Sequence, residues 1–475
     1  MEKEKFYLTA AIPYVNARPH LGHAQEFVEG DTIARHKRQH GFEARYISGA
    51  DENSLKNVQA AEKEGITPKE LCDRNCKAFT DLAEALNIGF DEFFRSSSQA
   101  HVKSSQELWR RCGESGDIYK KTYRGLYCVG CELFYTRDEL NENGECFEHP
   151  GRPLDEVEEE NYFFRLSRYQ HELEHLLESE EYAVVPETRK NEALSFVRRG
   201  LEDFSISRSV ARAHGWGVPV PGRAEQIMYV WFDALNVYRS SSPDWWPADL
   251  HVIGKGILRF HAVYWPAILL SAKLPLPKKL FVHGYITVSG QKMSKTVGNV
   301  VDPLALAERY GADALRYFLL REIPAYEDGD YTDQKFVERY NADLANGIGN
   351  FAARVTTLAA SAGPLPTTLQ TPDEVVLTIK QARERVEEAM RDFKFHEALA
   401  AIMALVSYGD GYVNAHKPWE THDKETVFAL VAILEDTAQL LTPFLPKTAE
   451  TILAALERTS DGIIVKKVSN LFPRV

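Results

Sequence analysis

The chain has 475 residues, of which 44% are hydrophobic and 26% are charged, and its net charge is −13. A chain of this length is too long to fold around one hydrophobic core, so we predict about three globular domains. No uninterrupted apolar run approaches roughly 18 residues, so we expect no membrane-spanning helix. The acidic balance disfavours indiscriminate binding to nucleic acids, although local basic patches can still contact a specific RNA.

The N-terminal region alternates strand and helix signals. Residues 1–5 are charged and lack the apolar core of a signal peptide, so we expect a cytoplasmic protein. The pattern predicts a buried strand at 6–10, a helix at 22–41 that ends near Gly41, and a strand at 45–49. A strand, a helix and a second strand in this order are typical of a parallel sheet.

The pattern changes in the middle of the chain. Residues 116–207 contain cysteines, turn residues and an acidic run at 155–160. Strand-like apolar runs then return at 227–231, 251–254 and 280–286. We therefore predict that an insertion divides a single α/β domain into two halves.

The last third of the chain is predominantly helical, because Gly and Pro become rare and the apolar positions follow helical spacing. The predicted helices lie at 352–360, 373–392, 396–413 and 425–441. The expected fold class is α/β: a Rossmann-type parallel-sheet domain, split by an insertion and followed by an α-helical bundle. The predicted segments are 1–115 (first half), 116–207 (insertion), 208–334 (second half and linking segment) and 335–475 (bundle).

The first chemical motif is His20-Leu21-Gly22-His23, placed where the loop after the first strand enters a helix. A helix N-terminus presents N–H groups and a positive dipole end, which favour phosphate. Gly22 lets a nucleotide approach the backbone closely, and both imidazoles can donate hydrogen bonds to phosphate oxygens. The alternative is an ordinary helix start with two surface histidines.

The second motif is the segment 292–296, Lys-Met-Ser-Lys-Thr, which follows the predicted strand at 280–286 and a Ser-Gly turn. Lys292 and Lys295 flank small or flexible side chains on a loop, an arrangement that can clamp a triphosphate. The alternative is a solvated basic loop. The two motifs occurring together favour a nucleotide site.

The insertion carries a candidate metal site. Its pattern is Cys128-x-x-Cys131 followed by Cys146-x-x-His149. Three thiolates and an imidazole suit one tetrahedral Zn²⁺, and because the protein fills all four positions we expect a structural role. The alternative is three reduced thiols and a surface histidine.

The two nucleotide motifs resemble the HIGH and KMSKS signatures of class I aminoacyl-tRNA synthetases. Thr296 departs from the final Ser but keeps its hydroxyl. Further matches narrow the resemblance to the methionyl-tRNA synthetase family and cover nearly the whole chain. They lie at 11–14, 49–52, 205–208, 229–234, 254–257, 260–265, 349–354 and 416–419.

The resemblance implies a binding site for L-methionine in which Asp51 holds the ammonium group. The implied set is Ala11, Ile12, Tyr14, Asp51, Trp231, Ala234, Tyr238, Ile257, His261 and Trp265. A flexible thioether suits a cage of aromatic rings, for which the candidates are Tyr14, Trp231, Tyr238 and Trp265. The alternative for any one of these rings is ordinary core, above all for Trp265 and Phe260.

Sulfur is a weak hydrogen-bond acceptor, whereas leucine accepts nothing. A donor against the sulfur would therefore favour methionine over leucine. The sequence offers two candidate donors for this purpose, Tyr14 O–H and His261 N–H.

The resemblance also implies ATP, with Mg²⁺, as a substrate. The implied ATP-binding residues are His20, Gly22, His23, Arg208, Lys292 and Lys295, of which His20, His23, Lys292 and Lys295 would be catalytic. The methionine carboxylate would attack the α-phosphate and form methionyl-adenylate, so no side chain need act as a nucleophile. Catalysis would come from positioning and charge stabilisation.

In the helical bundle the resemblance implies recognition of the tRNA(Met) anticodon by Asn350, Arg354 and Trp419. Asn350 and Arg354 lie one helical turn apart on the same face. The alternatives are a helix cap, a solvated charge and a core aromatic.

The resemblance also covers the insertion, because the family's insertion has the same zinc knuckle. The lack of a recognisable additional domain leads us to expect a monomer.

Besides Thr296, four positions depart from the family pattern: Asn53, Ser54, Leu235 and Gly256. These departures affect ATP-binding or pocket-shaping contacts and leave the ammonium site unchanged.

Three other functions remain open at this point: another class I synthetase such as the cysteinyl or leucyl enzyme, a nucleotidylyltransferase, and a non-enzymatic RNA-binding protein of synthetase-like fold. The intact motifs argue against the last, and the long helical segment argues against the second.

Overall fold

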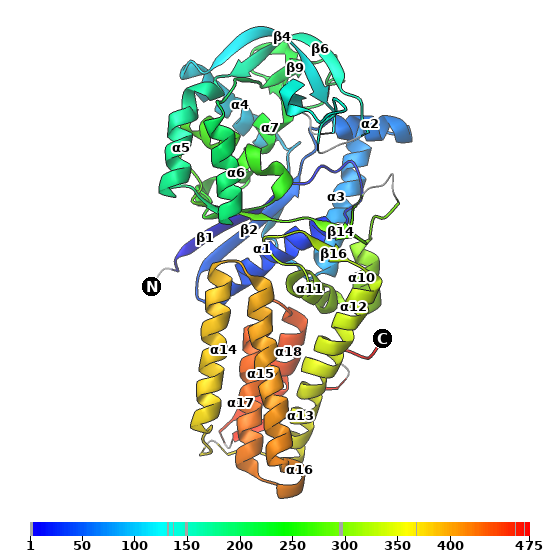
Figure 1. The fold of residues 1–475 in the computed structure, drawn as a ribbon, viewed down its shortest axis with the longest axis vertical. Helices are drawn as coiled ribbons and strands as arrows, with labels where there is room; N and C mark the ends of the chain where they lie inside the picture. Colours follow the sequence, from blue (N-terminus) through cyan, green and yellow to red (C-terminus); the bar gives the residue numbers. More distant parts are fainter. Residues whose placement is uncertain are drawn as a thin grey trace. The chain divides into compact units, whose positions relative to one another are not determined.

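The computed structural model describes residues 3–130, 133–135, 137–147, 151–293, 298–366, 368–460, 462–469 and 471–475. They form two compact units, which are described separately (Figure 1). The first comprises Met1–Pro19, Phe42–Leu82 and Gly89–His283, and the second comprises His20–Gly41, Ala83–Ile88 and Gly284–Val475. Across these described ranges, no helix has both the length and the apolar character needed to cross a membrane.

A six-stranded sheet forms the centre of the first unit, in the order β3-β2-β1-β12-β13-β7. Every neighbouring pair is parallel. The strands are β1 Lys5–Ala10, β2 Glu43–Ala50, β3 Glu92–Arg95, β7 Ala183–Val185, β12 Leu250–Gly254 and β13 Lys279–His283. The winding reverses between β1 and β12, and ligands of such sheets bind beyond the carboxyl ends of the strands at this point.

The strand predictions at 6–10, 45–49 and 251–254 are confirmed by β1, β2 and β12. The run at 280–286 was predicted as one strand but forms two: β13 ends at His283, and β14 Ile286–Val288 joins a different sheet. Edge strand β7 pairs with β13 although it lies within 116–207, so part of that segment belongs to the central sheet.

The segment 116–207 also contains a long antiparallel pair, β4 Ile118–Cys128 and β6 Asp155–Phe164. With β5 Leu133–Tyr135 and β8 Phe204–Ser205 they form a four-stranded sheet. The acidic run at 155–160, which carried no strand signal, is therefore the first part of β6. Cross-strand ion pairs compensate its charges, because Lys120 Nζ lies 2.8 Å from Glu160 and Arg124 Nη2 lies 2.8 Å from Glu156.

Helices complete the first unit. They include α2 Leu55–Glu64, α3 Pro68–Ala85, α4 Gln99–Glu114, α5 Gln170–Ser179, α6 Glu187–Arg198 and α9 Trp265–Ser271. The last turn of α3 belongs to the second unit. Ser98 caps α4 by accepting a hydrogen bond from the His101 backbone N–H, as expected for a serine before a helix.

The second unit contains the helix predicted at 22–41, which is α1 Leu21–Gln39, and the C-terminal helical bundle. The bundle consists of α13 Asn350–Ala362, α14 Asp373–Arg391, α15 Phe395–His416, α17 Lys424–Leu441 and α18 Pro446–Ala454. Helix α17 packs against α13, α15 and α18, and α14 packs against α15 (Figure 1). The four predicted helices of this region are confirmed.

The remaining elements of the second unit lie before, between and after the bundle helices. They are α10 Pro303–Tyr310, α11 Ala312–Arg321, α12 Asp333–Arg339, the π-helix Tyr340–Gly349, the short α16 Pro418–Thr421 between α15 and α17, the strands β14, β15 Gln291–Lys292 and β16 Gly329–Tyr331, and the hairpin of β17 Leu456–Thr459 with β18 Gly462–Val465.

A fully buried arginine joins three parts of the second unit. Arg316, on α11, forms an ion pair of 2.7 Å with Asp31 of α1, and both side chains are completely buried. The same guanidinium donates to the carbonyls of Leu86, Pro443 and Phe444. A buried charge is tolerated only when it is paired and hydrogen-bonded, and these contacts meet both conditions.

We predict that Arg316→Met lowers the free energy of unfolding by about 3–5 kcal/mol, since it leaves Asp31 buried with less compensating charge. Denaturant titration measures this loss. The matched control is Lys380→Ala, which removes an exposed ion pair with Glu384 on α14 and should leave stability nearly unchanged. Equal losses in the two variants would contradict this account of the buried pair.

Candidate functional site

Asp51 lies directly after β2, at the carboxyl end of the sheet, and is 3% exposed. Its backbone N–H donates to the Pro13 carbonyl at 2.9 Å, which brings it beside Tyr14. Its own carbonyl accepts from Asn57 Nδ2 at 2.9 Å. The backbone of Asp51 is therefore fixed next to the end of β1, where the switch point of the sheet places a ligand.

The departures at Asn53 and Ser54 have local structural roles. Asn53 N–H donates to the Asp51 carboxylate at 3.2 Å, and its Nδ2 donates to Asp233 Oδ2 at 2.6 Å. Ser54 caps α2 by accepting from the Lys56 N–H at 3.0 Å. Asn53 thus connects the end of β2 to the segment that carries Trp231.

Aromatic rings form a wall in the first unit. Tyr14 and Trp231 pack edge to face with centroids 6.3 Å apart, and Trp231 stacks on Phe260 at 3.7 Å. The sequence reasoning did not single out Lys56, whose Nζ lies 4.1 Å from the centroid of the Tyr14 ring. A positive charge over this ring is a favourable contact and fixes one side of the wall.

The prediction of a strand at 227–231 is wrong for the second half of that range. β11 covers Arg223–Met228, and the short helix α7 covers Val230–Ala234, so Trp231 and the buried Ala234 are helical. The apolar, β-favouring run cannot be distinguished from a buried helical turn by periodicity alone. The turn begins where the Phe232 N–H donates to the Tyr229 carbonyl at 2.9 Å.

The hydrogen bonds of His261 determine its protonation. Its Nδ1 lies 3.0 Å from the Ile257 carbonyl, which can only accept, so Nδ1 carries the proton. Its Nε2 lies 2.8 Å from Tyr238 Oη and accepts from that hydroxyl. Burial lowers the pKa of His261 to about 4, so the ring is neutral near pH 7. Its single N–H is used within the protein.

The other predicted methionine-site residues occupy different depths. Trp265 is fully buried and packs edge to face against Trp246 at 5.7 Å, as expected of a core residue. Ala11 is buried, whereas Ile12 and Ile257 are half-buried. Of the two further departures, Leu235 is buried and Gly256 is exposed.

In the second unit, His20 and His23 stand at the start of α1 with ring centroids 3.9 Å apart. His20 Nδ1 accepts from the Gly22 N–H, and His23 Nδ1 accepts from the His20 N–H, both at 3.1 Å. Desolvation, and then the neighbouring His20, hold the pKa of His23 well below its usual range. Because Nδ1 accepts, the proton of neutral His23 is on Nε2, where it can be donated to an anion.

The segment 292–296 is described only in part, since Lys295 and Thr296 lie outside the described residues. Lys292 is exposed on β15, with its Nζ 5.5 Å from the centroid of the Tyr285 ring. A Cβ added to Gly22 would lie 3.9 Å from Met293 Cε and 3.1 Å from His20 Cε1. The start of this segment therefore lies against the start of α1, within the same unit.

Arg208, which is expected to serve ATP, is buried on β9 Ser207–Ser209 in the first unit. Its guanidinium carbon lies 5.7 Å from the centroid of the Tyr229 ring and 5.9 Å from that of Tyr127. These aromatic contacts hold the arginine close to the segment that carries Trp231.

Of the four candidate zinc ligands, Cys131 and His149 lie outside the described residues. Cys128 and Cys146 are both buried. Cys128 ends β4 and is paired with Leu133 of β5. Cys146 Sγ lies 3.6 Å from Tyr135 Oη, which brings Cys146 against β5. Cys128 and Cys146 thus both lie beside β5, and their thiolate chemistry fits a zinc knuckle.

The structure brings two of the three anticodon candidates together. Arg354 on α13 lies with its guanidinium carbon 5.1 Å from the centroid of the Trp419 ring on α16. It also donates to Asn414 Oδ1 at 2.7 Å. Trp419 is 42% exposed, so it is not a core residue of the bundle. Asn350, at the start of α13, is exposed.

A cavity of about 1030 Å³ in the first unit was not expected from the sequence. Its wall combines aromatic side chains with charged side chains of both signs, including Tyr123, Phe204, Arg259, Glu202 and Tyr264. Phe204 and Tyr264 stack with centroids 4.3 Å apart. These residues are scattered along the chain, and no local motif connects them.

Comparisons with known proteins agree with this geometry. Residues 6–356 match the family described as tRNA synthetases class I (M), and residues 374–469 match the anticodon-binding domain of tRNA ligases. The methionine–tRNA ligase of Brucella melitensis biotype 1 is 43% identical over 97% of this chain and 93% of that protein. The Synechocystis methionine–tRNA ligase is 41% identical over 96% of this chain and 90% of its own length.

A solved structure gives the same result. Mycobacterium tuberculosis methionyl-tRNA synthetase in complex with methionyl-adenylate aligns with a TM-score of 0.94 and 39% identity, covering 99% of this chain and 100% of that chain. Both matched regions and the full-length relatives lead to one conclusion: this chain belongs to the methionine–tRNA ligase family of class I tRNA synthetases.

Proposed function

We propose that this protein activates L-methionine with ATP and transfers the methionyl group to the 3′ end of tRNA(Met). The observation that carries the proposal is the buried Asp51 at the carboxyl end of the parallel sheet, next to Tyr14, whose ring packs against Trp231. The family membership and the methionyl-adenylate bound by the similar solved structure support it.

Asp51 holds the ammonium group of methionine, because a carboxylate partner offsets the cost of desolvating that charge. The thioether lies against the aromatic wall, where sulfur beside a ring gains about 0.3–1.5 kcal/mol. Of the two sulfur donors considered, Tyr14 O–H is favoured, since the proton of His261 is directed at the Ile257 carbonyl. Tyr238 and His261 form the buried support of this wall.

In the first step, a methionine carboxylate oxygen attacks the α-phosphorus, the bond to the bridging oxygen breaks, and pyrophosphate leaves. His20 and His23 donate from Nε2 to the α-phosphate as its charge develops. Lys292 and Lys295 hold the leaving pyrophosphate, and buried Arg208 contributes a fixed positive charge to ATP. Mg²⁺ accompanies ATP and neutralises phosphate charge. The chain supplies positioning and electrostatics rather than a nucleophile.

In the second step, a hydroxyl of the terminal tRNA ribose attacks the methionyl carbonyl and AMP leaves. The exposed Trp419 stacks on an anticodon base, and Arg354 and Asn350 contact base edges beside it. The Arg354–Asn414 hydrogen bond holds the guanidinium next to the indole ring.

We also propose that Cys128, Cys131, Cys146 and His149 hold one structural Zn²⁺, which would stabilise the turn between β4 and β5. We further propose that the protein acts as a monomer in the cytoplasm. The division into 1–115, 116–207, 208–334 and 335–475 is kept as a functional map of the catalytic halves, the insertion and the anticodon-binding domain.

Asp51→Asn preserves the shape and the hydrogen bond from Asn53 but removes the charge. We predict that KM for methionine in ATP–pyrophosphate exchange rises by about 100-fold or more, as expected when a buried pair worth roughly 3–5 kcal/mol is broken. KM for ATP should change little. The control is Asp81→Asn, which alters an exposed pair with Lys77. A near-normal KM for methionine in Asp51→Asn would refute the ammonium role.

Trp419→Ala should separate the two activities. Loss of one stacked base costs about 1–3 kcal/mol, so kcat/KM for charging tRNA(Met) should fall by roughly 5- to 150-fold. Pyrophosphate exchange and the melting temperature should stay at wild-type values, because the indole is exposed. Leu377→Ala, at another exposed apolar residue of the bundle, is the control. Unchanged charging by Trp419→Ala would count against anticodon stacking.

Cys131→Ala should release one zinc ion per chain and increase proteolysis within the insertion, since structural zinc contributes folding energy. Elemental analysis of protein prepared without chelators measures the metal. Cys112→Ala, at a buried cysteine of α4, is the matched control and should keep its zinc. If Cys131→Ala and wild type carry the same amount of zinc, the proposed ligand set is wrong.

A further inference from the structure

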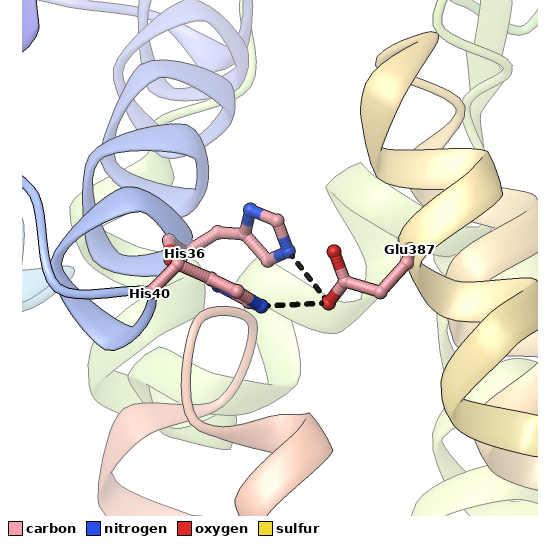
Figure 2. A group of neighbouring side chains, drawn as sticks. All are labelled: His36, His40 and Glu387. Atoms are coloured by element: carbon pink, nitrogen blue, oxygen red, sulfur yellow. Dashed lines mark hydrogen bonds and ion pairs between the residues drawn. The ribbon is translucent and has the colours of Figure 1, made fainter. Parts of the chain in front are cut away.

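Two histidines and a glutamate converge in the second unit, outside the sites described above. His36 lies in the last turn of α1, His40 follows that helix, and Glu387 lies on α14 (Figure 2). His36 Nε2 is 3.1 Å and His40 Nε2 is 3.0 Å from the same oxygen, Glu387 Oε1. Their ligand atoms all lie within 4.8 Å of one another.

The hydrogen bond of His40 makes this arrangement unusual. Its Nδ1 lies 2.8 Å from the His36 carbonyl, which can only accept, so Nδ1 carries the proton. In the neutral ring, Nε2 then directs a lone pair at a carboxylate oxygen 3.0 Å away. Two lone pairs at this distance repel each other unless a cation, either a proton or a metal ion, lies between them.

The surroundings of His36 disfavour a second proton in the cluster. Burial lowers the pKa of His36, and His40 and Lys37 lower it further, whereas Glu387 acts in the opposite direction. A neutral His36 can donate from Nε2 to Glu387 or, in its other tautomer, offer that nitrogen as a ligand. One divalent cation can satisfy both imidazoles and the carboxylate together.

The geometry matches metal coordination. Tetrahedral zinc with bonds of about 2.0–2.1 Å places its ligand atoms about 3.3 Å apart, which is close to the observed nitrogen–oxygen separations of 3.0 and 3.1 Å, and all three ligand atoms lie within 4.8 Å of one another. The His40 Nδ1–H donating to a backbone carbonyl is the contact that usually orients a metal-bound histidine. Exposed fractions of 43% for His40 and 41% for Glu387 leave an entry path and room for water as a fourth ligand.

We propose that His36, His40 and Glu387 bind one divalent transition-metal ion of the Zn²⁺, Co²⁺ or Ni²⁺ class. Imidazole and carboxylate ligands suit these ions. The site lies at the opposite end of α1 from His20 and His23, and a helix of 19 residues is about 28 Å long, so the metal does not contact the ATP site. It joins the end of α1 to α14 of the helical bundle.

Calorimetric titration of the untagged full-length protein with Ni²⁺ tests the proposal, because the loss of heat in variants of the three residues assigns the bound ion to this cluster. Wild type should bind one equivalent of Ni²⁺. His40→Gln and Glu387→Gln should each bind it at least about tenfold more weakly, as expected when one of three ligands is lost. Circular dichroism should show that both variants remain folded.

The matched control is His175→Gln. His171 and His175 are exposed on α5 with the same helical spacing as His36 and His40, but the carboxylate that pairs with His175 is Glu181, which closely follows the same helix and lies 3.8 Å away. This variant should bind Ni²⁺ like wild type. The proposal is overturned if wild type binds no Ni²⁺, if His40→Gln binds it normally, or if Glu387→Gln does so, since the last result would indicate chelation by a histidine pair alone.

Discussion

The second unit depends on one buried guanidinium. Arg316 neutralises Asp31 of α1 and satisfies three backbone carbonyls near α18 and the end of α3, in a place that water does not reach. Arg35 Nε also donates to Asp31, at 2.7 Å. The helix that presents His20 and His23 is thereby fixed within the same compact unit as the helical bundle. A charge network of this kind tolerates little displacement, because any lost partner leaves a desolvated charge.

In the first unit, hydrogen bonds determine which side chains remain able to recognise a ligand. His261 is held neutral, with both ring nitrogens engaged by the Ile257 carbonyl and the Tyr238 hydroxyl. In the proposed methionine site, selectivity for a thioether would therefore depend on the aromatic wall and on Tyr14, with Asp51 as the charge complement. The rigidity of this arrangement comes from Asn53 and Asn57, which tie the Asp51 segment to its neighbours.

The sequence was most informative where local chemistry determines structure. The alternation of β1, α1 and β2 follows from apolar periodicity and from Gly41, and α14 was located to within a residue. The acidic strand β6 could not be predicted, because its stability depends on basic partners across β4. The helical turn at Trp231 could not be predicted either, because tertiary packing places this residue in a helix although its local sequence favours a strand. In the cluster of His36, His40 and Glu387, the two histidines are one helical turn apart, but the carboxylate comes from a distant helix, so the sequence alone does not bring the three together.

A pocket built as described should activate methionine in preference to other amino acids. ATP–pyrophosphate exchange by the full-length protein, with methionine, leucine and cysteine supplied separately, measures this preference. We expect rapid exchange with methionine and a kcat/KM for leucine and cysteine at least about 100-fold lower, the scale at which pocket contacts discriminate similar side chains. Exchange that is fastest with leucine or cysteine, or absent with methionine, would show that the pocket is not built for methionine.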